Sequence, residues 1–137
     1  MTDNNRKPCI VTTLVPFLAV SNGARAVGFY KSAFGAAEVF RHEAFGGKVM
    51  ARLTIEGAEF WLSDEEPEFG NLSPETIGGS PVRMILTVKD PEAIFCRALE
   101  AGATQICPVT TELYWKIGKL VDPFGHTWEI GHPLNEE

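Results

Sequence analysis

The chain has 137 residues, a length that fits one compact domain and leaves little room for a second. Its 12 Lys and Arg residues are outnumbered by 18 Asp and Glu residues, and the formal net charge of −6 argues against a protein that binds nucleic acids or anionic membrane surfaces. Hydrophobic residues make up 45% of the chain, which is enough for a core and excludes a chain that is disordered throughout.

The first half of the sequence predicts one helix among four strands. A run of β-branched and aromatic residues predicts a strand over residues 10–20, in which Pro16 marks a sheet edge or a bulge. Residues 21–23 then offer a helix cap, apolar side chains recur at helical spacing, and Gly35 is a natural stop. Three further strands are expected at residues 37–42, 48–55 and 58–63. The order is therefore β-α-β-β-β in a first unit of about residues 10–63.

The second half repeats this order. A strand is predicted over residues 82–88, and Asp90 followed by Pro91 begins a helix that Gly102 ends. Three strands at residues 104–109, 114–121 and 127–131 complete a second unit of about residues 82–133. Residues 17–20 align with residues 85–88, and residues 57–62 align with residues 125–130 at the same offset. We therefore expect a single domain made of two equivalent units in a pseudo-twofold arrangement.

Residues 64–81 connect the two units and have no periodicity that predicts a helix or a strand. They are rich in turn-forming residues, and they contain no Lys or Arg beside the acidic residues Asp64, Glu65, Glu66, Glu68 and Glu75. This connector therefore carries most of the net charge, so the charge of the whole chain argues little against an anionic ligand elsewhere. We expect a solvated acidic loop here, or a lid.

Two segments carry a family resemblance. Residues 29–35, FYKSAFG, resemble the end of the first helix in the glyoxalase/bleomycin resistance/extradiol dioxygenase superfamily, the vicinal oxygen chelate fold. Residues 122–130, DPFGHTWEI, resemble the turn and final strand of its second unit. The spacing of the chain and residues 69–82 are similar to the PhnB-like branch, and the resemblance covers about residues 11–133. It implies an α+β fold in which two βαβββ units form a cupped mixed sheet, with the helices on the outer face.

The resemblance also implies where a metal centre would lie. Metalloenzymes of the superfamily place one ligand, usually His, Glu or Gln, on the first and last strand of each unit, and these positions correspond to Val15, Trp61, Arg83 and Glu129. Only Glu129 could bind a metal, because Val15 and Trp61 offer no suitable donor and Arg83 is a permanent cation. We therefore predict no metal and no other cofactor, and this disfavours the glyoxalase and dioxygenase reactions.

Strand alternation predicts which side chains face the cup. Residues of one parity share a face of the sheet, and those expected to face the cup are Val15, Phe17, Ala19, Glu59, Trp61, Ser63, Arg83, Ile85, Thr87, Thr127 and Glu129. The opposite parity is apolar and suits packing against helices. In the cup Arg83 could anchor an anionic or carbonyl group, while Trp61 and Phe17 stack on a planar group and Glu129 acts as a general base. We favour a simpler interpretation, an ion pair between Arg83 and Glu129, which is compatible with a bound ligand.

The His and Cys residues of the chain predict no second site. His42, His126 and His132 match none of the ligand positions, so we expect them in turns or at the surface. Cys96 lies on the second helix and is expected in the core, whereas Cys107 could face the cup in a structural rather than nucleophilic role. Cysteines without metal or redox spacing, and a polar start with no signal-like apolar segment, indicate a cytoplasmic protein.

Two functions are compatible with these residues. The first is a metal-free homodimer, its dimerisation implied by the resemblance, that binds a small, partly aromatic or anionic molecule in the cup. The alternative is a lyase or isomerase that uses Glu129 as a general base, with or without a divalent metal. Methyltransferase activity is not expected, because no glycine-rich nucleotide loop follows a strand. The expected partner is a small molecule, and neither nucleic acid nor membrane.

Overall fold

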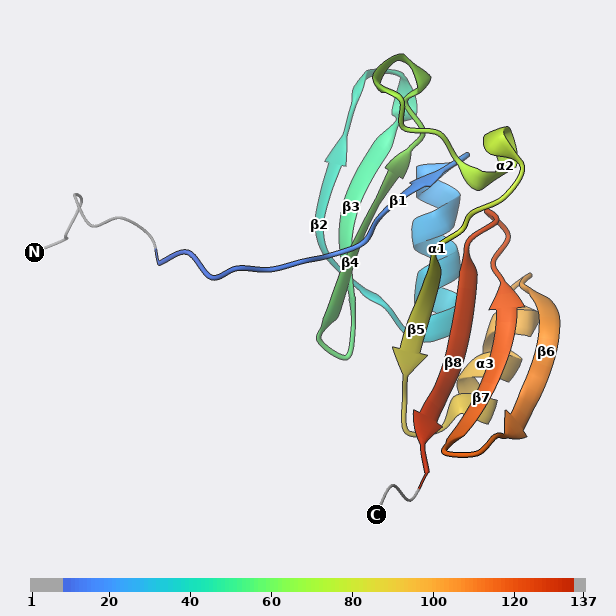
Figure 1. Ribbon diagram of the computed structural model, residues 1–137. Coiled ribbons are helices and arrows are strands. Elements are labelled where there is room, and N and C mark those ends of the chain that lie inside the picture. Colours follow the sequence, from blue (N-terminus) through green and yellow to red (C-terminus); the bar gives the residue numbers. More distant parts are fainter. Residues whose placement is uncertain (1–8, 135–137) are drawn as a thin grey trace, which may run out of the picture.

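The computed structural model describes residues 9–134 and contains two units of the same construction (Figure 1). The first unit comprises β1 (Phe17–Val20), α1 (Gly23–Phe34), β2 (Ala37–Glu43), β3 (Val49–Ile55) and β4 (Ala58–Asp64). The second comprises β5 (Arg83–Thr87), α3 (Pro91–Glu100), β6 (Thr104–Thr111), β7 (Trp115–Val121) and β8 (Thr127–Pro133). The order predicted from the sequence is therefore confirmed in both units.

Each unit contributes one four-stranded mixed sheet. The strand orders are β1-β4-β3-β2 and β5-β8-β7-β6, so the same pairing occurs twice. In each sheet the first strand runs parallel to the last strand of its unit, and the other neighbours are antiparallel. Helices α1 and α3 lie behind the sheets in Figure 1 and leave the other face of each sheet uncovered. This is the α+β fold of two βαβββ units with a cupped sheet that the sequence predicts.

Local sequence sets the helix ends. The side chain of Asn22 accepts a hydrogen bond from the backbone N–H of Arg25, which caps the start of α1. Gly35 follows the last helical residue with φ 69°, a left-handed conformation that glycine adopts without strain. The second helix begins in the same way, because the carboxylate of Asp90 accepts from the N–H of Ala93.

The core lies between the helices and the covered faces of the sheets. Alternate residues of the strands are buried there, as Leu18, Phe60 and Ile130 illustrate. Where the units meet, the buried hydroxyl of Tyr30 from α1 donates a hydrogen bond to the carboxylate of Asp122, which follows β7. Burial raises the pKa of Tyr30 well above its ordinary value, and the charge of Asp122 raises it further.

The strand predicted over residues 10–20 is wrong in its first part, because β1 begins only at Phe17. The preceding residues carry no strand pairing, and the side chains of Ile10 and Leu14 are 83% and 97% exposed. The reason is the register. Phe17 pairs with Trp61, so most of the segment before Pro16 runs past the start of β4 and has no neighbouring strand in this chain. The segment is extended by propensity, but within residues 9–134 it pairs with no strand.

The connector is also more structured than predicted. It contains two short helical turns, η2 (Pro67–Phe69) and α2 (Pro74–Ile77), and a third, η1 (Phe45–Gly47), lies before β3. Asp64 is the last residue of β4 and accepts from the N–H groups of Gly23 and Val49, at 2.9 and 2.7 Å. Hydrogen bonds from Ser73 and Thr76 to Glu65 lower the pKa of that carboxyl. These two acidic residues therefore hold the connector in place and are not merely solvated.

The prediction that Cys96 lies in the core is wrong. Its neighbour Phe95 and Ala98 are buried on the inner side of α3, whereas Cys96 is exposed on the other side. Successive side chains on an α-helix are about 100° apart around the helix axis, so adjacent residues can lie on the buried and the exposed side of the helix. No helix in the described part of the chain is long and apolar enough to cross a membrane.

Candidate functional site

Except for Val15, which precedes β1, the residues predicted to face the cup share the uncovered faces of the two sheets. Phe17 and Ile85 are 54% and 53% exposed, whereas Leu18, Met84 and Leu86 beside them are buried. The same alternation holds on β4 and β8, where Trp61 and Glu129 are partly exposed between buried neighbours. These uncovered faces form the candidate site, and β1, β4, β5 and β8 supply its predicted residues.

The predicted ion pair between Arg83 and Glu129 is present. Nε of Arg83 lies 2.6 Å from Oε2 of Glu129. The strand register explains the contact, because Ile85 pairs with Glu129 and places Arg83 diagonally across from it on the same face. The Arg83 side chain is 56% exposed and that of Glu129 is 20% exposed. Water screens a pair in this position, so we expect it to contribute little to stability and to leave the outer guanidinium donors open to a ligand.

An aromatic pair occupies the corresponding place in the first unit. The rings of Phe17 and Trp61 meet edge to face, with centroids 5.6 Å apart. The guanidinium of Arg52 lies 4.4 Å from the centre of the Trp61 ring, and Nε1 of Trp61 donates to the carboxylate of Glu59 at 2.7 Å. Trp61 is therefore fixed by a cation on its face and an acceptor at its edge.

Arg52 is a further residue of this face, which the sequence predictions do not include although the sequence holds a signal for it. It pairs with Trp61 across β3 and β4, and it is exposed between the buried residues Ala51 and Leu53. The alternation that assigned faces on the other strands would have placed it on the uncovered face. It adds a second cation to the candidate site.

The predicted residues fall in separate hollows. Val15, Arg83 and Ile85 line a hollow of about 490 Å³ where the two units adjoin. Phe17 and Ser63 line another of about 180 Å³ on the first unit. The face of β8 that carries the ion pair has its own hollow.

That third hollow has a volume of about 200 Å³, and Glu129 lines it together with Cys107 and Lys119. Cys107 therefore does face the uncovered side of its sheet. Thr87 lines a further hollow at the end of β5, and Trp61 and Thr127 line none of these four. A single chain thus does not bring the predicted residues into one cavity.

The histidines do not reach the ion pair. His126 closes the turn before β8, as one of its two expected placements requires, but it is buried rather than at the surface, and its Nε2 lies 2.9 Å from the carbonyl oxygen of Ala19 in the first unit. Its parity matches that of the buried Trp128, which is the signal that could have predicted this. His132 lies at the end of β8 with Nδ1 beside the carbonyl of Pro133. Among residues 9–134, no three His, Cys, Asp or Glu side chains gather as a metal site would require.

The comparisons with known proteins agree with this geometry. The family model described as "Glyoxalase/Bleomycin resistance protein/Dioxygenase superfamily" matches residues 10–130. An uncharacterised protein of Mycobacterium bovis is 40% identical over 128 residues, which cover 90% of this chain and 84% of that protein.

Solved structures are similar as well. The crystal structure of an Arabidopsis thaliana gene product matches with a TM-score of 0.70 and 35% identity, covering 90% of this chain and all of that chain. A mutant of the fosfomycin resistance protein FosX from Listeria monocytogenes, solved with Mn(II) and a dihydroxypropylphosphonic acid, matches with a TM-score of 0.66. Its identity is 12%, with 89% and 90% of the two chains covered, so this likeness shows the fold alone.

Proposed function

The chain belongs to the glyoxalase/bleomycin resistance protein/dioxygenase superfamily, and we propose that it is a PhnB-like member that binds a small, partly aromatic or anionic molecule on the uncovered faces of its sheets. The observation that carries this proposal is a half-exposed cation on the uncovered face of one sheet and at least partly exposed aromatic rings on that of the other. Arg83 offers guanidinium donors on β5, and Phe17 and Trp61 present their rings on β1 and β4. Cations and flat apolar surfaces of this kind suit a planar molecule that carries a carboxylate or phosphate.

The chemistry of Arg83 suits an anchoring role. A guanidinium has five N–H donors in a rigid fork, and the ion pair with Glu129 engages the Nε side of that fork. The remaining donors can bind both oxygens of a carboxylate in parallel. Glu129 then holds the fork in position, so a ligand does not have to order a long flexible side chain.

We propose that this binding is metal-free. The positions that the superfamily uses for metal ligands hold Val15, Trp61, Arg83 and Glu129 in this chain. The side chain of Arg83 repels a cation, and it already pairs with the one carboxylate of the set at 2.6 Å. This donor set does not fit the metal centre that the superfamily implies, so no step of the proposed function passes through a metal.

We also propose that the protein acts as a homodimer in the cytoplasm. Its hollows lie on the uncovered faces of two sheets, with the aromatic pair on one and the ion pair on the other. A second copy could bring the first unit of one chain against the second unit of the other. The two halves of the site would then face each other across one cavity. The proposed partner is a small molecule, and neither nucleic acid nor membrane.

The alternative proposal is a lyase or isomerase. Glu129 lines the hollow of about 200 Å³ that Cys107 and Lys119 share. A carboxylate there could take a proton from a substrate held beside it, with Lys119 or Arg83 stabilising the negative charge that develops. A divalent metal would belong only to this alternative.

A ligand screen with a metal assay tests these proposals. Thermal-shift measurements with aromatic carboxylates and phosphates should find compounds that stabilise the protein, and elemental analysis should find no stoichiometric zinc, nickel or iron. Arg83→Ala should abolish the stabilisation by these compounds. Arg41→Ala is the matched control, because Arg41 also forms an ion pair on a sheet, with Glu38 at 2.8 Å on β2. Tightly bound stoichiometric metal would overturn the metal-free proposal, and an unchanged response of Arg83→Ala would overturn the anchoring role.

A further inference from the structure

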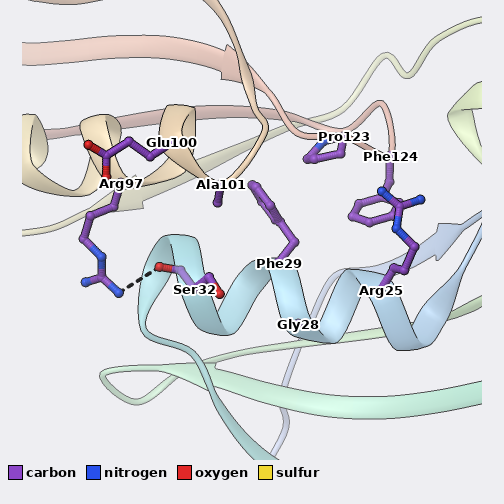
Figure 2. Close-up of a pocket in the computed structure, with 9 residues that line it drawn as sticks. All are labelled: Arg25, Gly28, Phe29, Ser32, Arg97, Glu100, Ala101, Pro123 and Phe124. Atoms are coloured by element: carbon purple, nitrogen blue, oxygen red, sulfur yellow. Dashed lines mark hydrogen bonds between the residues drawn. The ribbon is translucent and has the colours of Figure 1, made fainter.

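A groove of about 540 Å³ lies on the helical side of the molecule, away from the uncovered sheet faces. Figure 2 shows it between α1 and α3, closed at one side by the turn that precedes β8. Arg25, Gly28 and Ser32 line it from α1, Arg97 and Ala101 line it from α3 and its end, and Phe124 lines it from the turn. The superfamily resemblance assigns no role to these residues.

The spacing of the α1 residues places two cations far apart along the groove. Arg25 and Ser32 are seven residues apart, which is two helical turns on one face and an axial distance of about 10 Å. Arg97 reaches across from α3 and donates from Nη2 to the carbonyl oxygen of Ser32 at 2.9 Å. The two guanidinium groups therefore lie at opposite ends of the groove, as Figure 2 shows.

Both arginines are held in place, and the part of the chain that the structure describes gives neither an acidic partner. The guanidinium of Arg25 lies 5.4 Å from the centre of the buried Phe124 ring, and Arg97 is held by its bond to Ser32. Within residues 9–134, no carboxylate oxygen comes within 4.0 Å of either guanidinium. Glu100 also lines the groove, but Figure 2 shows its carboxylate pointing along α3 rather than across to α1.

Gly28 lies between these ends and keeps the middle of the groove open. A glycine inside a helix costs about 1 kcal/mol relative to alanine, so its presence needs a reason. A left-handed backbone is not the reason, because Gly28 has no positive φ. Close packing is not the reason either, because a Cβ built at this position meets nothing within 4 Å. The remaining explanation for a glycine at position 28 is that it leaves open space in the groove, beside the ring of Phe29.

We propose that this groove binds an elongated small molecule with an anionic group at each end and an apolar or flat middle. Arg25 would bind one carboxylate or phosphate and Arg97 the other, with the middle of the ligand over Gly28 and Phe29. One compact anion cannot contact both guanidinium groups, because about two helical turns separate the places where they are held. The groove is thus a second binding site, independent of the site on the sheet faces.

The probes are linear dicarboxylates of increasing chain length, each with the monocarboxylate of equal length as a control. Isothermal titration calorimetry should show affinity that rises to an optimum length and then falls, with monocarboxylates at least tenfold weaker. In heteronuclear NMR spectra the amide signals of Gly28, Ser32 and Ala101 should shift. Arg25→Ala and Arg97→Ala should each weaken the best dicarboxylate by about tenfold, as the loss of one charge-assisted contact predicts. Arg41→Ala on β2 is the matched control, because Arg41 pairs with Glu38 and lines neither proposed site, and it should bind as the wild type does.

Two results would overturn the proposal. One is that no dicarboxylate of any length binds, or that affinity is independent of length and equal for monocarboxylates. The other is that the double variant Arg25→Ala/Arg97→Ala binds like the wild type, or that only signals from the sheet faces shift. Gly28→Leu supplies a check that leaves both charges in place. It should abolish binding by filling the groove, while the thermal unfolding temperature stays at or above that of the wild type.

Discussion

The hydroxyl of Tyr30 donates a hydrogen bond of 2.5 Å to the carboxylate of Asp122, and this contact joins the two units through a buried pair. Asp122 also accepts from Nε1 of Trp128 and from the backbone N–H groups of Phe124 and His126, at 2.9 to 3.0 Å. One buried carboxylate thus organises the turn before β8 and binds it to the first helix. Because a buried charge is costly when its hydrogen bonds are missing, this network should be central to stability.

Tyr30→Phe should therefore destabilise the protein although it removes a single oxygen atom. The variant leaves Asp122 buried with one donor fewer, and we expect a loss of about 1–3 kcal/mol in the free energy of unfolding. Urea denaturation followed by circular dichroism measures it. Tyr114→Phe is the control, because Tyr114 is the other tyrosine of the chain and is exposed. Equal stability of the two variants would contradict a structural role for the contact.

Alkaline pH should weaken the fold through the same tyrosine. The pKa of Tyr30 is raised above its ordinary value of 10.0 by burial and by Asp122, so the folded chain keeps a proton that the unfolded chain loses. The contribution of the Tyr30 proton to the free energy of unfolding is fully present below pH 10.0. It is lost as the pH rises above that value, at about 1.4 kcal/mol per pH unit. Urea denaturation between pH 8 and 11 measures the slope. The free energy of unfolding should fall less steeply with pH in the Tyr30→Phe variant than in the wild type, whereas the Tyr114→Phe variant should keep the wild-type slope.

Much of the fold could be predicted because the determining signals are local. Asn22 and Asp90 cap their helices where the sequence places them, and strand alternation assigned the faces of β1, β4, β5 and β8. The same alternation predicted the ion pair of Arg83 with Glu129, because it places both side chains on the same face of neighbouring strands.

What could not be predicted depends on long-range packing. Residues 10–13 lie beyond the start of β4 in the register of β1, and the propensity of residues 10–16 contains no information about that. Asp122 and Tyr30 appeared in the two family segments, but their contact becomes visible only once α1 and the turn before β8 are packed together. Arg25 and Arg97 come from two helices that must be docked before a groove exists, so no sequence pattern predicted that groove.

Gly28→Ala should stabilise the protein. The Cβ meets nothing within 4 Å, the residue is inside α1, and its backbone is helical. Alanine loses less conformational entropy there, so we expect a gain of about 0.5–1 kcal/mol in the free energy of unfolding. Urea denaturation tests the gain, and a loss of stability would show that the helix needs a glycine at this position.

The same substitution at Gly131 should have the opposite effect. A Cβ built on Gly131 lies 2.1 Å from the carbonyl oxygen of Lys116 and 2.8 Å from Cα of Ile117. Both are backbone atoms of β7, which cannot move without breaking the pairing with β8. Gly131→Ala should therefore cost at least about 3 kcal/mol, the upper part of the range for overpacked cores. A midpoint of urea unfolding within error of the wild type would show that β7 and β8 separate more easily than their pairing indicates.

The ion pair on the sheet face should matter for ligand binding more than for stability. Its side chains are 56% and 20% exposed, so solvent screens the attraction between them. A double-mutant cycle with Arg83→Ala and Glu129→Ala should give a coupling of no more than about 1 kcal/mol in urea denaturation. If Arg83 anchors a ligand, Arg83→Ala should nevertheless remove the thermal stabilisation by compounds from the screen. Glu129→Ala should weaken it less, because that variant only frees the guanidinium to move. A coupling of several kcal/mol would indicate instead that the two side chains are retained for stability, and the proposed anchor would then lose its main support.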